Sequence, residues 1–179
     1  MAFTPWGSDP LTRIILIRHA KAEAPQLGLD DHDRPLTMQG RTAAAQLAEA
    51  LVAAGVTIDV ALVSSAVRAQ QTWKRMADAF DGTESRVVES LYETHIGGVL
   101  AELTALEDLG CVAIVGHEPT ISATASWLAG PGSNTKALQR VGNGMPTASA
   151  ALLDFEGPWA ELDHTGAVLT AICAADALY

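Results

Sequence analysis

The chain has 179 residues, of which 49% are hydrophobic and 18% charged, and its formal net charge is −10. This length fits one domain with a sizeable core, and the hydrophobic content excludes a disordered chain. The acidic excess argues against nucleic acid as a general partner, because binding to a phosphate backbone needs clustered Lys and Arg. Any anion site must therefore be a local basic pocket within an acidic surface.

Several features predict a cytoplasmic protein that does not bind membranes. No apolar run is long enough to span a bilayer, and residues 1–12 lack the basic and apolar regions of a signal peptide. Cys111 and Cys173 both lie in apolar runs, without the spacing of a metal site, and are expected to be free and buried. We expect residues 1–12 to be a flexible lead-in and residues 13–179 to form one domain.

Strand-like apolar runs alternate with helical patterns along the chain. In chain order, we predict a strand at 13–18, a helix at 37–54, a strand at 59–65, a helix at 66–80, a strand at 85–90, a helix at 98–106, a strand at 111–117, a helix at 119–129, a loop at 130–147 with one helical turn at 136–140, and strands at 148–155, 158–162 and 167–173. Thr37 is a plausible N-cap for the first helix. The alternation predicts an α/β fold, namely a three-layer α/β/α sandwich with a mainly parallel central sheet.

Polar residues follow four of the predicted strands, at the point where each strand ends. Arg18 and His19 end the first strand, Arg68 follows the second in the first turn of a helix, Glu93 follows the third, and His117 ends the fourth. Parallel strands share one exit edge, where ligands bind in such sheets. These side chains are therefore expected to converge on one rim.

Each of these residues alone has an ordinary explanation, such as a solvent-exposed strand end or a surface arginine. Other kinds of site fit less well. A metal site would need HxxxH or HExxH spacing, and Arg18 beside His19 would oppose a cation. A nucleotide site would need a Gly-rich phosphate loop, and Ser64 lacks the GxSxG elbow of a serine nucleophile. The joint pattern favours a phosphate site with a nucleophilic histidine.

The motifs around these residues resemble the histidine phosphatase superfamily, also called the phosphoglycerate mutase-like fold. "LIRHA" at 16–20 is similar to its RHG signature, and "SSAVRAQQT" at 64–72 and "VGHEPTI" at 115–121 match later motifs. "DRPLTMQGR", "LYE" and "PTASAALLDF" make the chain most similar to the small bacterial phosphohistidine phosphatases of SixA type. The resemblance spans roughly residues 14–173.

The resemblance implies a role for each residue at the strand ends. His19 would be the phosphorylated nucleophile, and Arg18, Arg68 and His117 would form the phosphate pocket. Glu93 matches the position of the proton donor in many members. His117 could donate a hydrogen bond to phosphate if protonated, and no metal or other cofactor is required.

Departures from the family pattern narrow the expected substrate. Ala20 stands where glycine is commoner, "KAEA" at 21–24 lacks the Glu-Thr-Asn pattern of mutases, and "ETHIGGV" lacks their tryptophan motif. These differences count against a phosphoglycerate mutase. Without a large cap insertion the site should be shallow and open, which suits a phosphorylated side chain on a protein surface.

We therefore expect a metal-independent phosphatase of protein phosphohistidine, with a phosphorelay domain as a possible partner. Two alternatives stay open: a phosphatase of a small phosphomonoester, and a non-catalytic module that binds phosphate. The charged turn at 30–34 is expected to be solvated, although Arg34 could touch the substrate, and Lys21, Lys136 and Arg140 could help to bind an acidic partner.

Overall fold

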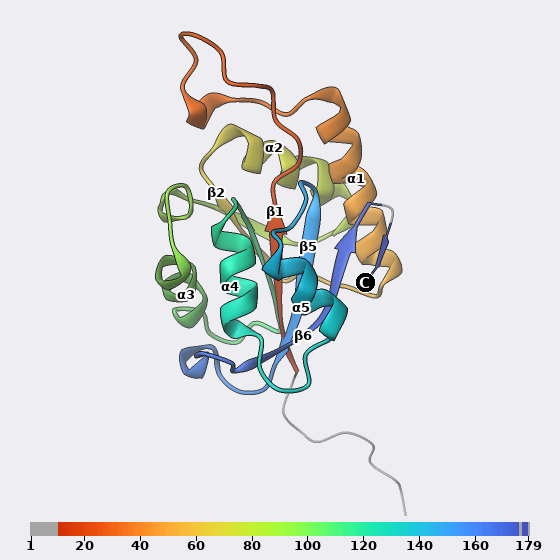
Figure 1. The fold of residues 1–179 in the computed structure, drawn as a ribbon, viewed down its shortest axis with the longest axis vertical. Coiled ribbons are helices and arrows are strands. Elements are labelled where there is room, and N and C mark those ends of the chain that lie inside the picture. Colours follow the sequence, from red (N-terminus) through yellow and green to blue (C-terminus); the bar gives the residue numbers. More distant parts are fainter. Residues whose placement is uncertain (1–10, 176, 179) are drawn as a thin grey trace, which may run out of the picture.

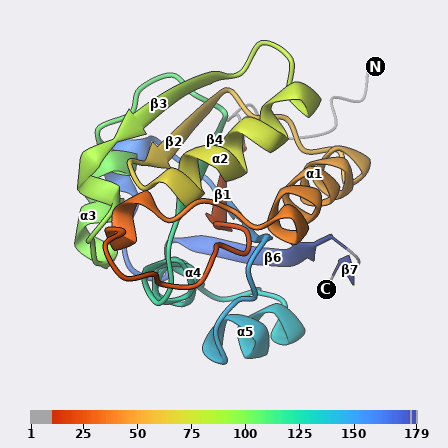
Figure 2. The same ribbon diagram turned by 90° about the horizontal axis from the view of Figure 1, so that it is seen from above.

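The computed structural model describes residues 11–175 and 177–178, which form a sheet between two layers of helices (Figure 1, Figure 2). Among these residues the strands are β1 (Thr12–Arg18), β2 (Val60–Ser64), β3 (Glu84–Val88), β4 (Cys111–Gly116), β5 (Ser149–Phe155), β6 (Ala167–Ala174) and β7 (Ala177–Leu178). The helices are α1 (Met38–Ala53), α2 (Val67–Met76), α3 (Ile96–Thr104), α4 (Thr120–Leu128) and α5 (Thr135–Gly142).

The sheet has the strand order β3-β2-β4-β1-β5-β6-β7. The first four of these strands run parallel to one another, whereas β5 pairs antiparallel with β1 and β6 antiparallel with β5. The mainly parallel sheet with two helical layers confirms the predicted fold class. Because β4 lies between β2 and β1, the ends of these three strands are neighbours, and the start of β5 lies beside the end of β1.

The two faces of the sheet carry separate hydrophobic clusters, and β1 shows why. Ile14 and Leu16 face the cluster that includes α3, α4 and α5, whereas Ile15 and Ile17 face the cluster that includes α1 and α2. All four side chains are fully buried. A strand buried on both faces gives a continuous apolar run rather than an alternating one. This is the pattern that ends abruptly at Arg18.

Two predicted segments differ from the structure. The predicted loop at 130–147 contains the whole of α5, whose N-cap Asn134 accepts hydrogen bonds from the backbone N–H groups of Lys136 and Ala137. The strand predicted at 158–162 is wrong, because this segment is a 3₁₀ turn at Trp159–Glu161. Trp159 is buried there and its indole N–H donates to the carbonyl of Leu109, 2.9 Å away.

Other predictions stand or lie outside the described residues. Cys111 and Cys173 are free and buried, as expected. Within the described part of the chain, no helix has the length and apolar character needed to cross a membrane. β1 begins at Thr12, one residue earlier than predicted, and residues 1–10 lie outside the described residues. The division into a lead-in and one domain stays a prediction.

Hydrogen bonds hold the start of α1 against the segment that follows β1. Thr37 is its N-cap, as predicted, and its hydroxyl accepts from the backbone N–H of Gly40. The carbonyl of Lys21 accepts from the backbone N–H and the hydroxyl of Thr37. A Cβ built on Gly40 would collide with that same carbonyl oxygen. Glycine is therefore required for the close approach of α1 to residue 21.

We predict that Gly40→Ala lowers the free energy of unfolding by about 1–3 kcal/mol, because backbone must move to accept the methyl group. Urea unfolding checks this. Gly142→Ala is the matched control, since Gly142 is also helical and has open space around its would-be Cβ. Gly142→Ala should be neutral or stabilising. Equal effects of the two changes would contradict the steric explanation.

Candidate active site

A cavity of about 390 Å³ lies where β1, β2 and β4 end, and the segment between β1 and α1 crosses over this edge (Figure 2). His19 and His117 line it. Four cationic side chains also line it, namely Arg18, Lys21, Arg34 and Arg68, against the two carboxylates Asp31 and Glu118. This local excess of positive charge agrees with the expectation that an anion site in this acidic chain is a local basic pocket.

His19 is held so that one ring nitrogen is free of a proton. Its Nδ1–H donates to the carbonyl of Ala20 at 2.7 Å, which leaves a lone pair on Nε2. The Nε–H of Arg68 points at that nitrogen from 3.3 Å. Burial lowers the pKa of His19 to about 4, with the charges of Arg68 and Arg18 adding to the effect. The imidazole is therefore neutral at pH 7 and able to act as a nucleophile.

His117 lies beside His19, with 5.1 Å between the ring centroids, and is fixed by a buried serine. Its Nε2 is 2.8 Å from the hydroxyl oxygen of Ser64, which also accepts from the backbone N–H of Ala66. The hydroxyl hydrogen of Ser64 is buried and needs an acceptor. Nε2 of His117 provides that acceptor, so the ring hydrogen of His117 lies on Nδ1. Burial lowers the pKa of His117 to about 3, so this donor is available without protonation.

Arg68 is bound on its other side by the turn at Asp31–Asp33. Its Nη1 donates to the backbone carbonyl of Asp31 at 2.6 Å and its Nη2 to the Asp31 carboxylate at 3.0 Å. The same carboxylate accepts from Arg34 and from the hydroxyl of Tyr92. Partial desolvation alone would raise the pKa of Asp31, but these bonds and the charge of Arg68 outweigh it and hold the pKa below its ordinary value.

Arg18 is positioned by the segment that enters β5. Its Nη1 donates to the carbonyl of Met145, whose backbone N–H donates to the hydroxyl of Ser122 at 3.0 Å. That hydroxyl donates in turn to Glu118 at 2.7 Å. Thr147 of the same segment lines the cavity. The chain of bonds links an arginine at the end of β1 to the start of α4.

Two buried hydrogen-bond donors at the cavity have no partner within the part of the chain that the structure describes. They are the Nε–H of Arg18 and the Nδ1–H of His117. A buried donor without a partner is costly, so each is expected to bond to something the protein takes up. With the surrounding cations, these donors suit an anion with several acceptor oxygens, as phosphate has.

The structure brings four of the five predicted site residues together, namely Arg18, His19, Arg68 and His117. Glu93 is exposed and is not among the residues that line the cavity. Its role as a proton donor stays a prediction.

Sequence reasoning missed Asp31, Ser64 as a partner of His117, and Thr147. The 30–34 turn was expected to be solvated, yet Asp31 bonds Arg68 and His32 bonds Ser65. The composition of "DDHDR" is the same for a solvated turn and for one folded onto an arginine, so the sequence offers no signal for Asp31.

Comparison with known proteins decides the family. The model of the histidine phosphatase superfamily (branch 1) matches residues 14–104. An uncharacterised protein of Mycobacterium tuberculosis is 36% identical over 155 residues, covering 86% of this chain and 96% of the relative. The chain belongs to the histidine phosphatase superfamily.

Solved structures of this family share the fold closely. The proposed phosphohistidine phosphatase SixA of Nakamurella multipartitia superposes with a TM-score of 0.79 at 31% identity, covering 94% of this chain and 97% of that one. The proposed SixA of Agrobacterium tumefaciens gives a TM-score of 0.72 at 30% identity, covering 80% and 92%. The resemblance to SixA-type proteins seen in the sequence is confirmed.

We predict that His19 and His117, which are half-buried, lower stability in acid. Their pKa values are lower in the folded chain than the ordinary 6.5, so the unfolded chain binds more protons between pH 6.5 and about 4. The free energy of unfolding should then fall with pH across this window, by up to about 1.4 kcal/mol per pH unit for each imidazole. Urea unfolding at pH 7, 6 and 5 measures it.

His117→Asn should remove roughly half of this dependence, since one of the two groups no longer titrates. His164→Asn changes an exposed histidine and serves as the control. A pH dependence that is identical in wild type and His117→Asn would show that the buried imidazole does not contribute.

Proposed function

We propose that the protein is a metal-independent phosphatase that acts through a phosphohistidine intermediate on His19 and dephosphorylates protein phosphohistidine. The observation that carries the proposal is the state of His19. Its neutral Nε2 stands in a cavity with four cations and two buried donors that have no partner among the residues the structure describes. A nucleophile and an anion site coincide there.

The proposed reaction has two phosphoryl transfers. In the first, the lone pair of His19 Nε2 attacks phosphorus while the bond to the leaving group breaks, and Arg68 turns its Nε–H from His19 to a phosphate oxygen. Arg18 and His117 donate to the other oxygens and stabilise the charge spread over them. In the second, water attacks the phosphorus of phosphorylated His19, which releases phosphate and restores the imidazole.

The surroundings of the cavity favour phosphohistidine over an alkyl phosphate. An alkoxide must gain a proton as it leaves, whereas an imidazole leaves more readily and picks up its proton from water. Of the carboxylates that line the cavity, Asp31 has a lowered pKa and is ionised at pH 7. The cavity rim includes the exposed Lys21 and Asp31, so a side chain on another protein can reach in. Solved relatives carry the SixA name.

The place of action and the partner are part of the proposal. Two free, buried cysteines accord with a reducing compartment, and we propose a cytoplasmic location. A phosphorylated histidine on a phosphorelay domain fits the chemistry of the cavity. A small phosphomonoester is the second candidate substrate.

We predict that the enzyme hydrolyses an aryl phosphate in the presence of EDTA and that His19→Ala abolishes this activity, because the attacking nitrogen is lost. Arg18→Ala and Arg68→Ala should each lower kcat by about 10²–10³, the usual scale for a positioned charge stabiliser. Rapid acid-free quenching with labelled substrate should reveal phosphate bound to wild-type protein and none on His19→Ala.

Loss of activity with EDTA, or activity that survives in His19→Ala, would contradict the mechanism. Phosphate binding without turnover of any substrate would instead identify a non-catalytic binding module. Titration calorimetry with inorganic phosphate measures the binding. It is applied to wild type and to Arg34→Gln, a variant that removes one cation of the cavity lining and keeps both histidines.

We predict that Glu93→Gln hardly slows hydrolysis of phosphohistidine, because an imidazole needs little help to leave and Glu93 lies outside the cavity lining. If Glu93 is the acid for other substrates, an alkyl phosphomonoester should slow by about 10²-fold or more. The measurement is the rate on each substrate for wild type and Glu93→Gln at matched pH.

A large loss on both substrates would contradict the leaving-group explanation. Negligible turnover of phosphohistidine by wild type, beside efficient monoester hydrolysis, would place the second candidate substrate first. Glu102→Gln, a change on α3, controls for the loss of one negative charge near this edge of the sheet.

A further inference from the structure

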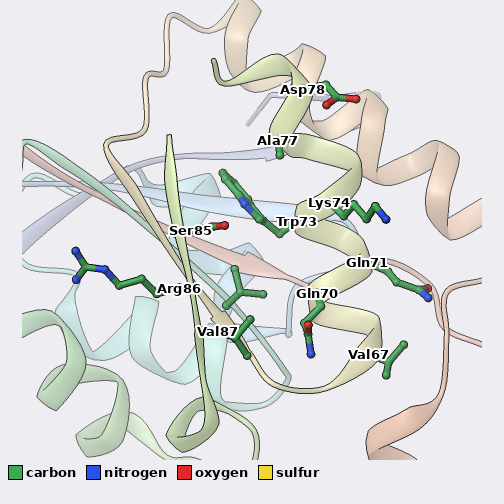
Figure 3. A pocket seen from close by; sticks show the side chains of 11 residues that line it. Val67, Gln70, Gln71, Trp73, Lys74, Ala77, Asp78, Ser85, Arg86 and Val87 are labelled. Atoms are coloured by element: carbon green, nitrogen blue, oxygen red, sulfur yellow. The ribbon is translucent and has the colours of Figure 1, made fainter. Parts of the chain in front are cut away.

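A second and larger hollow lies beside α2, away from the residues assigned to the reaction. This groove has a volume of about 520 Å³ and runs between α2 and β3. In Figure 3, Trp73 lies between the helix and the strand, Val87 lies further along the strand, and Val67 lies at one end of the helix. The groove therefore has an apolar floor formed by both elements.

The groove is open because the helical layer stops short of the sheet edge. β3 is the edge strand, paired with β2, and its first four residues are exposed. Val87 is 60% exposed although it is large and apolar. Five apolar residues share the lining with six polar or charged ones, Asp78 among them. An apolar hollow with a polar rim on a surface commonly marks an interaction site.

The other side of α2 is basic. A hollow of about 120 Å³ there is lined by Arg41, Gln71, Lys74 and Arg75, and two of these residues, Gln71 and Lys74, also line the groove. We call the groove and this hollow together the α2 surface. Among the described residues, no carboxylate forms an ion pair with Arg41, Lys74 or Arg75. Arg41, Lys74 and Arg75 thus form a local basic patch in a chain of net charge −10.

The α2 surface adjoins the candidate active site. Val67, at one end of the groove, precedes Arg68, and Lys74 follows Arg68 by six residues, about 9 Å along a helix. The side chain of Gln71 accepts a hydrogen bond from the backbone N–H of Leu36, in the segment that carries Arg34. A molecule lying along α2 would thus have one end beside the cavity.

We propose that the α2 surface docks an acidic amphipathic helix of the phosphorylated protein substrate, an inference that rests on the function proposed above. The occupant would lie on the sheet face over β3 and continue the layer made by α1 and α2. Its apolar stripe would contact Trp73 and Val87, and its acidic flank would face Lys74 and Arg75. This is recognition of a helix in a groove, with charge complementarity setting specificity.

The basic charge of the α2 surface also counters the repulsion between this acidic chain and an acidic partner. A net charge of −10 repels an acidic partner at long range. A compact patch of unpaired cations attracts the same partner within about a Debye length, roughly 8–10 Å at physiological salt. The α2 surface would then orient the partner as well as hold it.

The test uses a fluorescein-labelled 18-residue helical peptide with Leu on one face and Glu on the other. Anisotropy should show saturable binding to wild type that weakens with added salt. The double change Lys74→Glu and Arg75→Glu, and separately Val87→Asp, should each weaken binding by about tenfold or more. The comparison is Lys136→Glu with Arg140→Glu on α5, the other cations considered above for an acidic partner. This double change alters net charge equally on the opposite face of the sheet, and it should leave binding unchanged if the α2 surface is the docking site.

Three outcomes would overturn the proposal. A peptide with Lys in place of Glu could bind equally well, which would remove the charge preference. The α5 control could lose as much affinity as the α2 variants, which would indicate general electrostatic attraction. Gel filtration could show a dimer that Val87→Asp dissociates, which would make a second copy of this chain the occupant.

A kinetic measurement separates this proposal from the proposed function. On a histidine-phosphorylated four-helix domain with acidic helices, the Lys74→Glu and Arg75→Glu variant should raise KM about tenfold with kcat kept, while aryl phosphate hydrolysis stays unchanged. If wild type turns over neither substrate, the proposed function fails. Peptide binding then still tests docking at the α2 surface. Unchanged KM despite weakened peptide binding would remove the link to substrate.

Discussion

Arg68 must keep a positive charge in the interior, and the arrangement of the site follows from this constraint. Only 6% of the residue is exposed, and a buried charge is tolerated when it is bonded to partners. Asp31 supplies a carbonyl and a carboxylate, and His19 supplies a ring nitrogen. The hydroxyl of Thr72 donates to the carbonyl of Arg68 and accepts from the backbone N–H of Ala20, which ties α2 to the strand end. One guanidinium thus fixes the turn at Asp31–Asp33 and His19, the proposed nucleophile, together.

The site contains unfavourable interactions that a bound anion would relieve. Two imidazoles are kept neutral chiefly by burial, and donors of Arg18 and His117 have no partner among the described residues. Phosphate accepts hydrogen bonds from such donors and carries the charge that the surrounding cations favour. The burial and the donors that suit the site to phosphate therefore also lower its local stability.

The sequence predicted the parts of the site that parallel strands bring together. Arg18, Arg68 and His117 each follow a buried apolar run, and ends of adjacent parallel strands must meet. Thr147 could not be placed in this way, because its position depends on β5 pairing antiparallel with β1, which no local pattern reports. Asp31 was missed because a charged turn has the same composition whether it is solvated or folded onto an arginine.

The errors in secondary structure have similarly local causes. α5 is flanked by "GPGSN" and "GNG", and these loop signals concealed a helix whose cap, Asn134, belongs to the first of them. In residues 158–162, Trp159 and Leu162 suggested a strand, yet they are buried by a turn in which the indole bonds the carbonyl of Leu109. Burial of two apolar residues three positions apart fits a single turn as well as a short strand. Tertiary contacts, rather than propensity, decided both segments.

A carboxylate beside the proposed phosphate site would ordinarily oppose binding, so the position of Asp31 needs a physical account. A guanidinium has five N–H donors. Asp31 takes one on Nη1 and one on Nη2, and His19 is bonded to Nε. Two Nη hydrogens have no acceptor among the described residues, and in the proposed reaction the Nε–H is released once His19 attacks phosphorus. Asp31 therefore orients the arginine without occupying the donors that phosphate would use, and its own charge is already neutralised by Arg68 and Arg34.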